Sequence, residues 1–584
     1  MTDITFSTIQ ELPKGWRILH RSRQYQFAVI DGASPHNLHI IQRNHTIIAY
    51  LSNLEQPHDL HVFKHPDFIR HIGISSGILW HTQSDEFCIF RDAFGFIPWL
   101  STPKRGVFTT NPDYHAGMHA HSALNDSWFS NFLQYKTDTS DADVYEDSER
   151  VIPGQARYWI KSDVEAFLSE MVEDKPREPG ILHTKIEQIW DQLDLQPLDS
   201  PRATIAEGLR HELIQAAARI PATNLCFTLS GGLDSSGILA AWLQSNAGPV
   251  DAVTLVSKAH ATCDESHEID ILEKAFPIHV TRLVMDDSWP LSQPQLYRTC
   301  KGYGPMCSPG IESTVNMNRT IQDLLGPRTI ITGHGGNFIV KARPEAIWRH
   351  LLLHPNWNSI AKEIKAVHQN YHLLRRTLGN LANGYFKKLW HALHPQNQTD
   401  PNDPTMWLQP GFRSKHAPER VDPVFFMTHI EERTNMFQTW EWELHARALD
   451  IVARQTQHHF YDPLFDFDLY AYCSRIPPQY FLEGGEYRPI YKEALAPLLP
   501  PEIIAHPKCQ SFDDLMHDGL ANQGKPLILK AIEDLNEGPL KDILEANGLN
   551  ASYEAYCDEI HRGNTDIPLL GLWRALSAAI WCSD

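Results

Sequence analysis

The sequence of 584 residues predicts a β-rich α+β domain followed by an α/β domain with a parallel sheet. Three observations lead to this prediction. Short apolar segments separated by turn residues fill the first third of the chain. From about residue 200 onward, helical and strand patterns alternate, as they do in parallel α/β sheets. Within this part, an apolar strand at 225–229 turns through two glycines into a helix, an arrangement that presents backbone N–H groups to an anion.

Composition limits the class of protein. The formal charge of −20 argues against nucleic acid as the main partner. The nine cysteines form no C-x-x-C pair, so neither a disulfide framework nor a structural zinc site is expected. No run of about 18 apolar residues occurs and the N-terminus lacks a signal-like segment. We therefore expect a cytoplasmic protein that makes no membrane contact.

The first domain is expected to span residues 1–180, including a charged, proline-containing linker at 173–180. A short amphipathic helix is predicted at 184–195. The predicted strands of this domain lie at 25–30, 38–41, 46–51, 78–81, 86–90 and 106–110.

Two segments of this domain, Arg91-Asp92-Ala93-Phe94-Gly95-Phe96-Ile97-Pro98-Trp99 and Val151-Ile152-Pro153-Gly154, resemble the glutaminase domain of class II amidotransferases. The resemblance implies an N-terminal-nucleophile (Ntn) type β sandwich whose nucleophile is an N-terminal cysteine. Here the second residue is Thr2 and the first cysteine is Cys88. Thr2 could serve as a nucleophile, but a degenerate, structural domain is the favoured interpretation.

The second domain is expected to span residues 181–584. Helices are predicted at 205–220 and at 264–275, the latter carrying Asp264 and Glu265. Strands are predicted at 225–229, 250–256, 279–285 and 329–332. Two glycine-rich loops follow strands, at 230–236 and 333–337. Because ligands bind beyond the carboxyl ends of strands in open parallel sheets, both loops should border one site.

The first loop, Ser230-Gly231-Gly232-Leu233-Asp234-Ser235-Ser236, lacks the Lys-Ser/Thr of a Walker A loop. It resembles the pyrophosphate loop of enzymes that cleave ATP between its α and β phosphates. With Gly333-His334-Gly335-Gly336-Asn337 and several later segments, it makes the chain similar to the asparagine synthetase superfamily. Those later segments are 461–466, 487–494, 499–504 and 506–512.

The resemblance implies an adenine-nucleotide alpha-hydrolase-like domain with added helices, and ATP and Mg²⁺ as cofactors. Asp234 and Asn337 are the expected Mg²⁺ ligands, although Asn337 stands where the family has a second carboxylate, for which Asp264 or Glu265 could substitute. Asp234 could also cap a helix. The residues expected to bind the nucleotide are Ser230, Gly231, Gly232, Asp234, Ser235, Ser236, Val256, Gly333, Gly335 and Gly336.

Within the superfamily, the chain most resembles lasso-peptide cyclases, because it lacks the N-terminal cysteine and carries His334 in its second glycine-rich loop. These join a peptide's N-terminal amine to an Asp or Glu side chain. His334 is expected to act as a base with a pKa near ~6.5, or else is a structural histidine. Lys508 is expected to contact the adenylate, or else is a surface lysine. A precursor peptide and a leader peptidase are the implied partners. Ammonia-dependent asparagine synthase, a β-lactam-type synthetase and a non-catalytic peptide-binding scaffold remain alternatives.

One further segment differs in charge from the rest of the chain. Between Lys341 and Pro395 there are nine Lys and Arg residues against two Asp and Glu. This basic segment could form a helical insertion or lid that docks an acidic peptide, or a solvated helical face.

Overall fold

A computed structural model of the chain describes residues 2–342, 406–416, 435–506 and 513–583. Lys508 and all of the basic segment beyond residue 342 lie outside the described residues. Within the described ranges, short gaps fall at 9–11, 23, 32–35, 53–56, 66–67, 72, 120–121, 135–138, 178–180, 195, 222–223, 247, 260–263, 294–295, 297–300, 484–485 and 565–568.

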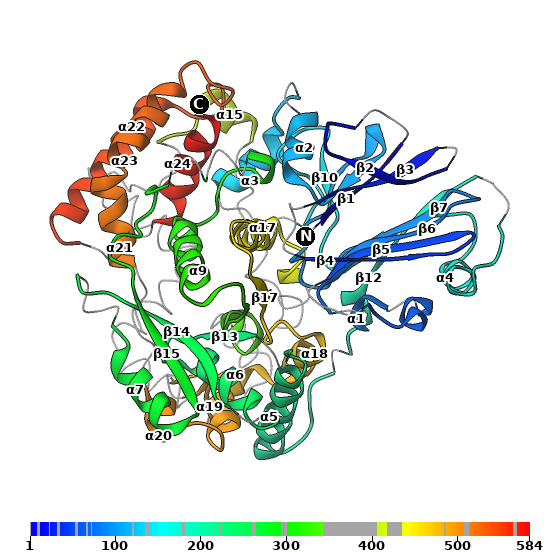
Figure 1. Cartoon of the computed structure of the whole chain (residues 1–584). Helices are drawn as coiled ribbons and strands as arrows, with labels where there is room; N and C mark the ends of the chain where they lie inside the picture. The colour runs from blue at the N-terminus through cyan, green and yellow to red at the C-terminus, as the bar shows by residue number, and fades with distance from the viewer. Residues whose placement is uncertain are drawn as a thin grey trace.

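Two six-stranded antiparallel sheets form the N-terminal part, stacked as two layers (Figure 1). Phe6 of the first sheet packs against Trp80 and Phe87 of the second, so aromatic side chains fill the space between the layers. The first sheet has the order β10 (Glu149–Arg150), β8 (Leu100–Thr102), β9 (Val107–Thr109), β1 (Thr2–Thr8), β3 (Tyr25–Asp31) and β2 (Arg17–Arg21).

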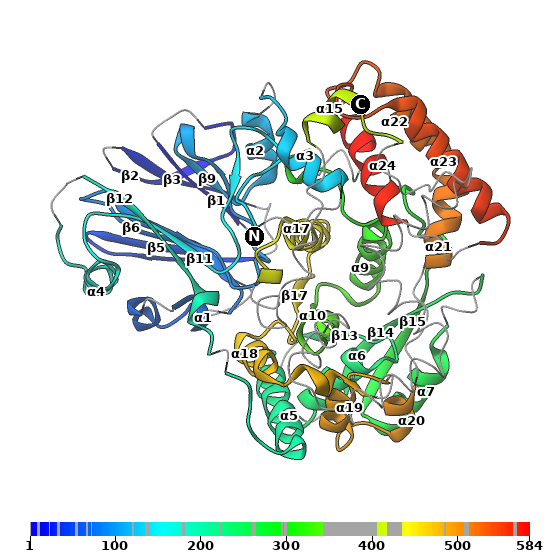
Figure 2. The same ribbon diagram turned by 180° about the vertical axis from the view of Figure 1, so that it is seen from behind.

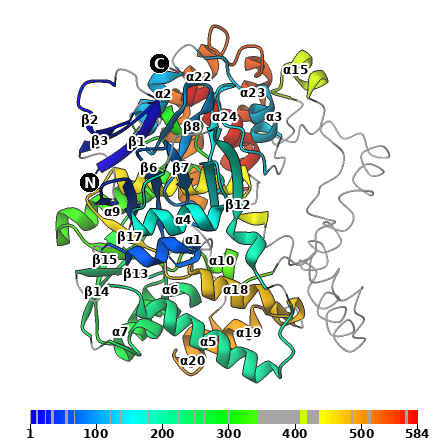
Figure 3. The same ribbon diagram turned by 90° about the vertical axis from the view of Figure 1, so that its right-hand side faces the viewer.

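The second sheet contains the most completely buried strands. Every residue of β5 and β6 is buried, because the first sheet covers one face and α4 (Val164–Glu173) covers part of the other, as seen from that side in Figure 3. The predicted strands of this domain are all present, which confirms the β-rich architecture. The order is β12 (His183–Gln188), β11 (Gln155–Ile160), β7 (Glu86–Phe90), β6 (Ser75–His81), β5 (Thr46–Ser52) and β4 (Asn37–Gln42).

The predicted helix at 184–195 is wrong. Residues 183–188 form β12, which pairs with β11 along its whole length, and only a 3-10 turn, Ile189–Gln192, follows. The edge of β11 offers unpaired backbone groups, and β-branched Thr184 and Ile186 favour an extended chain. The second sheet therefore extends beyond residue 180, where we expected the linker to end.

The C-terminal part is built on a parallel sheet with the order β15 (Ile278–Val284), β14 (Val250–Val256), β13 (Leu225–Thr228), β16 (Thr329–Ile331) and β17 (His459–Tyr461). Four of these strands match the prediction, whereas β17 is only three residues long and was missed. The chain leaves β13 toward β14 on one side and later adds β16 on the other. This reversal of strand order opens a crevice at the carboxyl ends of β13 and β16.

Helices cover both faces of this sheet. On one face lie α5 (Arg202–Ala218), close to the predicted 205–220, and α6 (Leu233–Trp242). On the other face, α9 (Ile311–Leu325) buries Ile321 against Cys226 and Ile330. The predicted helix at 264–275 is α7 (Ser266–Ala275), so Asp264 and Glu265 precede the helix rather than lie in it.

Helix α17 (Trp440–Arg454) lies between the N-terminal sheets and α9 (Figure 1), and buried ion pairs join it to the N-terminal domain. Glu443 is paired with Arg91 at 2.6 Å, with Arg447 at 2.9 Å and with Arg150 at 3.6 Å. Arg447 also binds Asp143 at 2.9 Å. Such a cluster, with exposed fractions of 3% or less, fixes the angle at which the two domains meet.

The remaining helices α22 (Lys525–Asp534), α23 (Ala546–His561) and α24 (Leu570–Cys582) pack beside α17 and α3 (Asp126–Leu133) in a separate apolar cluster (Figure 2). Among the described residues, no helix has the length and apolar character needed to cross a membrane.

Candidate active site

The two glycine-rich loops are in direct contact. The first glycine loop (residues 230–236) joins β13 to α6, and the second (residues 333–337) joins β16 to α10 (Gly336–Ile339). A Cβ atom on Gly333 would lie 2.3 Å from the Ser235 backbone nitrogen, and one on Gly336 would lie 2.1 Å from the Asp234 carboxyl carbon. Glycine is therefore required at both positions because no side chain fits between the loops.

The first glycine loop presents the groups expected of an anion site. Gly231 has a φ of 64°, and Gly232 is the N-cap of α6, whose first N–H groups have no carbonyl partner within the helix. The Ser235 hydroxyl accepts a hydrogen bond from the Ser230 N–H at 3.2 Å and lies 3.2 Å from the Ser230 hydroxyl. The buried Ser236 hydroxyl has no hydrogen-bond partner among the described residues. The loop thus combines a helix N-terminus with closely spaced hydroxyls.

Asp234 lies in the first turn of α6, so Gly232, not Asp234, is the N-cap residue of this helix. Arg488 donates a hydrogen bond from Nη1 to Asp234 Oδ1 at 2.7 Å. Arg488 adopts a left-handed conformation, with a φ of 57°, and its guanidinium lies over the Tyr491 ring. A non-glycine residue in this conformation carries a strain cost, which is typical of functional sites. The segment 487–494 contributes to the family resemblance, but no sequence signal pointed to a role for Arg488.

Mg²⁺ fits the groups around Asp234. The carboxylate is partly exposed and Arg488 contacts only Oδ1, whereas Asn337 follows Gly336 directly and is exposed. The described residues contain no group of three or more His, Cys, Asp or Glu that could hold a metal. Because Mg²⁺ in nucleotide sites is held by one or two protein ligands plus phosphate oxygens, Asp234 and Asn337 would be enough protein ligands for it.

A second wall of the first glycine loop comes from α7. A Cβ on Gly231 would lie 2.6 Å from Glu268 Cβ and 3.6 Å from Glu265 Cβ. Glu265 thus lies beside the loop, whereas Asp264 accepts hydrogen bonds from Ser266. Buried Glu268, which sequence analysis missed, pairs with His506 at 3.1 Å. His506 is two residues before Lys508, the expected contact of the adenylate.

Val256 ends β14, the neighbour of β13, and its N–H and C=O groups lie at the same carboxyl edge of the sheet as the glycine loops. The following residues are held in place because Ser257 Oγ donates to Asp286 at 2.6 Å. The nucleotide contact at Val256 stays a prediction.

His334 of the second glycine loop pairs with His445 of α17. Their Nε2 atoms are 2.9 Å apart and the rings stack at 4.7 Å. Burial lowers the pKa of His334 to about 4 and that of His445 to about 3. The expected pKa near 6.5 is therefore corrected: because burial disfavours the imidazolium, both rings are neutral at pH 7. No sequence signal pointed to His445, which is 111 positions away.

A hydrogen-bond chain supports the second glycine loop from β17. The His334 N–H donates to Thr332 Oγ1 at 2.9 Å, and the Thr332 hydroxyl donates to Asp462. Burial raises the pKa of Asp462 to about 6. The weakly acidic carboxyl group of Asp462 and the neutral ring of His334 are therefore linked through Thr332 at the start of the second glycine loop.

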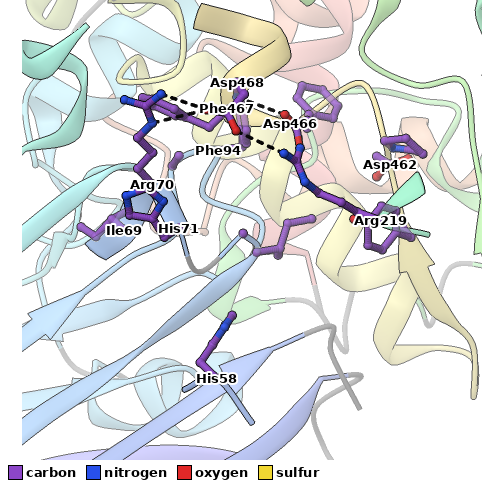
Figure 4. A pocket seen from close by; sticks show the side chains of 16 residues that line it. His58, Ile69, Arg70, His71, Phe94, Arg219, Asp462, Asp466, Phe467 and Asp468 are labelled. Carbon is purple, nitrogen blue, oxygen red and sulfur yellow. Dashed lines mark hydrogen bonds and ion pairs between the residues drawn. The ribbon is translucent and has the colours of Figure 1, made fainter. Parts of the chain in front are cut away.

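Two cavities meet at Asp462. One, of about 420 Å³, lies beside His334 between the sheet, α9 and α17. The other, of about 280 Å³, lies at the seam between the domains and is shown in Figure 4. There Arg70 and Arg219 extend toward Asp466 and Asp468 and pair with them. Both guanidinium groups already have carboxylate partners, so the seam cavity offers no open cation from these two residues.

Two comparisons with known proteins were informative to different degrees. The comparison with curated proteins gave no match. The family model for asparagine synthase matches residues 208–582, which include both glycine loops, the parallel sheet and the C-terminal helices. Because the match covers well over half of the chain, this protein belongs to the asparagine synthase family, whose members are ATP-dependent ligases.

Proposed function

We propose that this protein is an ATP-dependent peptide cyclase of the lasso-peptide type. It would activate an Asp or Glu side chain of a precursor peptide as an acyl adenylate and join it to the peptide's N-terminal amine, releasing AMP and pyrophosphate. The observation that carries the proposal is the neutral pair formed by His334 of the second glycine loop and His445 of α17. This pair borders a cavity without Lys or Arg among its described lining residues. An amine nucleophile suits such a site.

The N-terminal domain gives independent support. A glutamine-hydrolysing member would need a reactive thiolate, and Cys88 is the first cysteine of the chain. Cys88 is fully buried in β7, and burial raises the pKa of its thiol well above the ordinary value. Since the thiolate is the nucleophilic form, Cys88 is inert at neutral pH.

In the first half-reaction, a carboxylate oxygen attacks the α-phosphorus of ATP and the bond to the β-phosphate oxygen breaks. Negative charge then grows on the departing pyrophosphate. The N–H groups of Gly231 and Gly232 and the hydroxyls of Ser230 and Ser235 would stabilise it. Mg²⁺, held by Asp234 and Asn337, would supply Lewis-acid charge to the phosphates. Lys508 keeps its proposed role beside the adenylate.

In the second half-reaction, the amine nitrogen attacks the acyl carbon, AMP leaves, and the nitrogen loses a proton. An N-terminal amine has a pKa near ~8, so roughly a tenth is already neutral at pH 7. His334 is neutral and can accept the second proton as the bond forms. Its low pKa makes it a weak base, so its contribution depends on placement beside the amine more than on proton affinity.

The proposed function is tested by ATP–pyrophosphate exchange with synthetic peptides that carry a free N-terminus and one internal Asp or Glu. We expect exchange with such peptides and a product lighter by one water. Exchange with free aspartate and none with peptides would instead indicate an ammonia-dependent asparagine synthase. Peptide binding without pyrophosphate release from any carboxylate, aspartate and β-amino acids included, would indicate a non-catalytic scaffold.

Replacing Asp234 with asparagine is expected to lower exchange by on the order of 10²–10³-fold, because the carboxylate that lies against Gly336 of the second glycine loop loses its charge. The substitution keeps the shape that fits against Gly336. When exchange is measured as a function of Mg²⁺ concentration, the variant should need more Mg²⁺ than the wild type to reach half of its maximal rate. A variant with unchanged exchange at low Mg²⁺ would remove Asp234 from metal binding.

Replacing His334 with alanine is expected to slow product formation by roughly 10²–10⁴-fold while exchange is retained. Because the pKa of His334 is about 4, the histidine is deprotonated from pH 5 upward and becomes protonated only as the pH falls through about 4. The ratio of wild-type to variant rate should therefore stay constant between pH 5 and 8. A ratio that changes severalfold around pH 6.5 would contradict the low pKa.

A leader peptidase that exposes the amine remains the proposed partner, because the reaction needs a free N-terminus. The basic segment is the proposed docking surface for an acidic part of the precursor.

A further inference from the structure

The cavity of about 420 Å³ beside His334 has a composition that restricts what can enter it. Its volume falls in the range of small-molecule pockets. Most of its described lining is apolar and comes from α9, α17, the sheet and α21 (Asp513–Asp518). Its large apolar side chains include Ile311, Met317, Leu449, Val452, Phe460 and Met516.

The titratable groups nearest the second glycine loop form one polar side of the cavity, while His36, Ser308, Thr314 and Asn318 line it elsewhere. Thr332, His334, His445 and Asp462 line it there, whereas Asp450 is paired with Arg454 at 2.6 Å. No Lys or Arg is among the described residues that line this cavity. The carboxylates of a free aspartate would find no cation there, and burying them without one is costly. An amine, by contrast, meets a carboxylate and two neutral imidazoles.

The cavity also adjoins the place where the chemistry is proposed. Thr332 lines it and directly precedes Gly333, which contacts the Ser235 backbone of the first glycine loop. Thr228 lines it as well and lies two residues before Ser230. A group bound in the cavity therefore lies close to the start of both glycine loops.

We propose that this cavity binds an apolar side chain on the amine-bearing end of the peptide, with the amine held at the polar rim. This inference rests on the proposed function and deepens it: the cavity selects peptides with an apolar residue at the end that supplies the amine, and it rejects small acidic amino acids.

The test uses phenylalaninamide as the probe, because it joins a free amine to an apolar side chain and lacks a carboxylate. Glycinamide and L-aspartate are the comparison ligands, and binding to the full chain is measured by ligand-detected NMR titration without ATP. Burying an aromatic side chain predicts at least tenfold tighter binding of phenylalaninamide than of glycinamide. Equal binding of the two amides, or tighter binding of aspartate, would overturn the proposal.

Thr314 of α9 lines the cavity and gives a matched pair of variants. Thr314→Phe fills the space and should weaken phenylalaninamide binding at least tenfold. Thr314→Val keeps the size of the side chain, loses only the hydroxyl that donates to the Gly310 carbonyl at 3.2 Å, and should bind within twofold of wild type. Circular dichroism confirms that each variant is folded. If Thr314→Phe does not fold, Ala448→Leu fills the cavity from α17 and is expected to have the same effect. Unchanged binding in a folded filling variant would overturn the proposal.

Pyrophosphate exchange separates this inference from the proposed function. Exchange with peptides together with no phenylalaninamide binding would overturn the cavity assignment alone. Phenylalaninamide binding together with no exchange from any peptide would overturn the cyclase assignment and leave the cavity assignment standing.

Discussion

Gly333→Ala is expected to lower ATP–pyrophosphate exchange about 10²-fold. The added Cβ would lie 2.3 Å from the Ser235 nitrogen and 2.6 Å from its Cα, and both are backbone atoms that cannot rotate away. Relief requires the two glycine loops to separate by about 1 Å, a misplacement that costs roughly this factor in rate. The same overpacking should lower the free energy of unfolding by about 1–3 kcal/mol.

The matched control is Gly117→Ala near the end of α2 (Pro112–Met118), where a Cβ would meet nothing within 4 Å. This change should leave exchange intact and stabilise the fold by a few tenths of a kcal/mol to about 1 kcal/mol. Exchange and thermal unfolding are measured on both variants. Wild-type exchange in Gly333→Ala would show that the two loops do not need to touch.

Glu443→Gln is expected to lower the free energy of unfolding by about 3–5 kcal/mol. The carboxylate is buried among Arg91, Arg150 and Arg447, and the substitution leaves these guanidinium groups with one fewer counter-charge. Since Arg91 and Arg150 belong to the N-terminal domain and Glu443 to α17, the loss should loosen the junction between the domains.

The destabilisation caused by Glu443→Gln is expected to depend on pH. Burial alone would raise the pKa of Glu443, but the three neighbouring arginines together outweigh it and lower the pKa to about 2, against an ordinary value of 4.5. A lowered carboxyl pKa contributes stability that is fully present above pH 4.5 and is lost as the pH falls toward 2. The difference in unfolding free energy between wild type and Glu443→Gln should therefore narrow over that window. Chemical denaturation at several pH values measures this difference, with exposed Glu207→Gln of α5 as the control. A difference that does not change with pH would contradict the role of the charge.

Much of the fold could be predicted because its signals are local. The strand, double glycine and helix at 225–243 make a pattern that few other structures can accommodate, and alternating periodicity located four of the five parallel strands. The helix predicted at 184–195 failed because the edge of β11, distant in sequence, captured the segment as β12. The short strand β17 was not predicted for the same reason: it is a strand because it pairs with β16, and not because of its own composition.

The candidate site divides in the same way. Both glycine loops, Asp234 and His334 were identified from sequence, because glycines at close approaches and a polar residue between them leave a recognisable pattern. Arg488, Glu268 and His445 were not, because each reaches the site from an element far along the chain. The low pKa of His334 was also hidden, since it follows from burial beneath α17.

The sequence by itself determined the strand, double-glycine loop and helix that this chain shares with the asparagine synthase family, because loop geometry and dipole direction are local properties of residues 225–243. Only the tertiary structure decided what surrounds that loop. The packing of α9 and α17 against the sheet forms an apolar cavity whose described lining contains no Lys or Arg. The same packing places the Nε2 atoms of His334 and His445 2.9 Å apart. Those are consequences of long-range contacts, which a local sequence pattern does not encode, and the proposed preference for an apolar, amine-bearing peptide end depends on them.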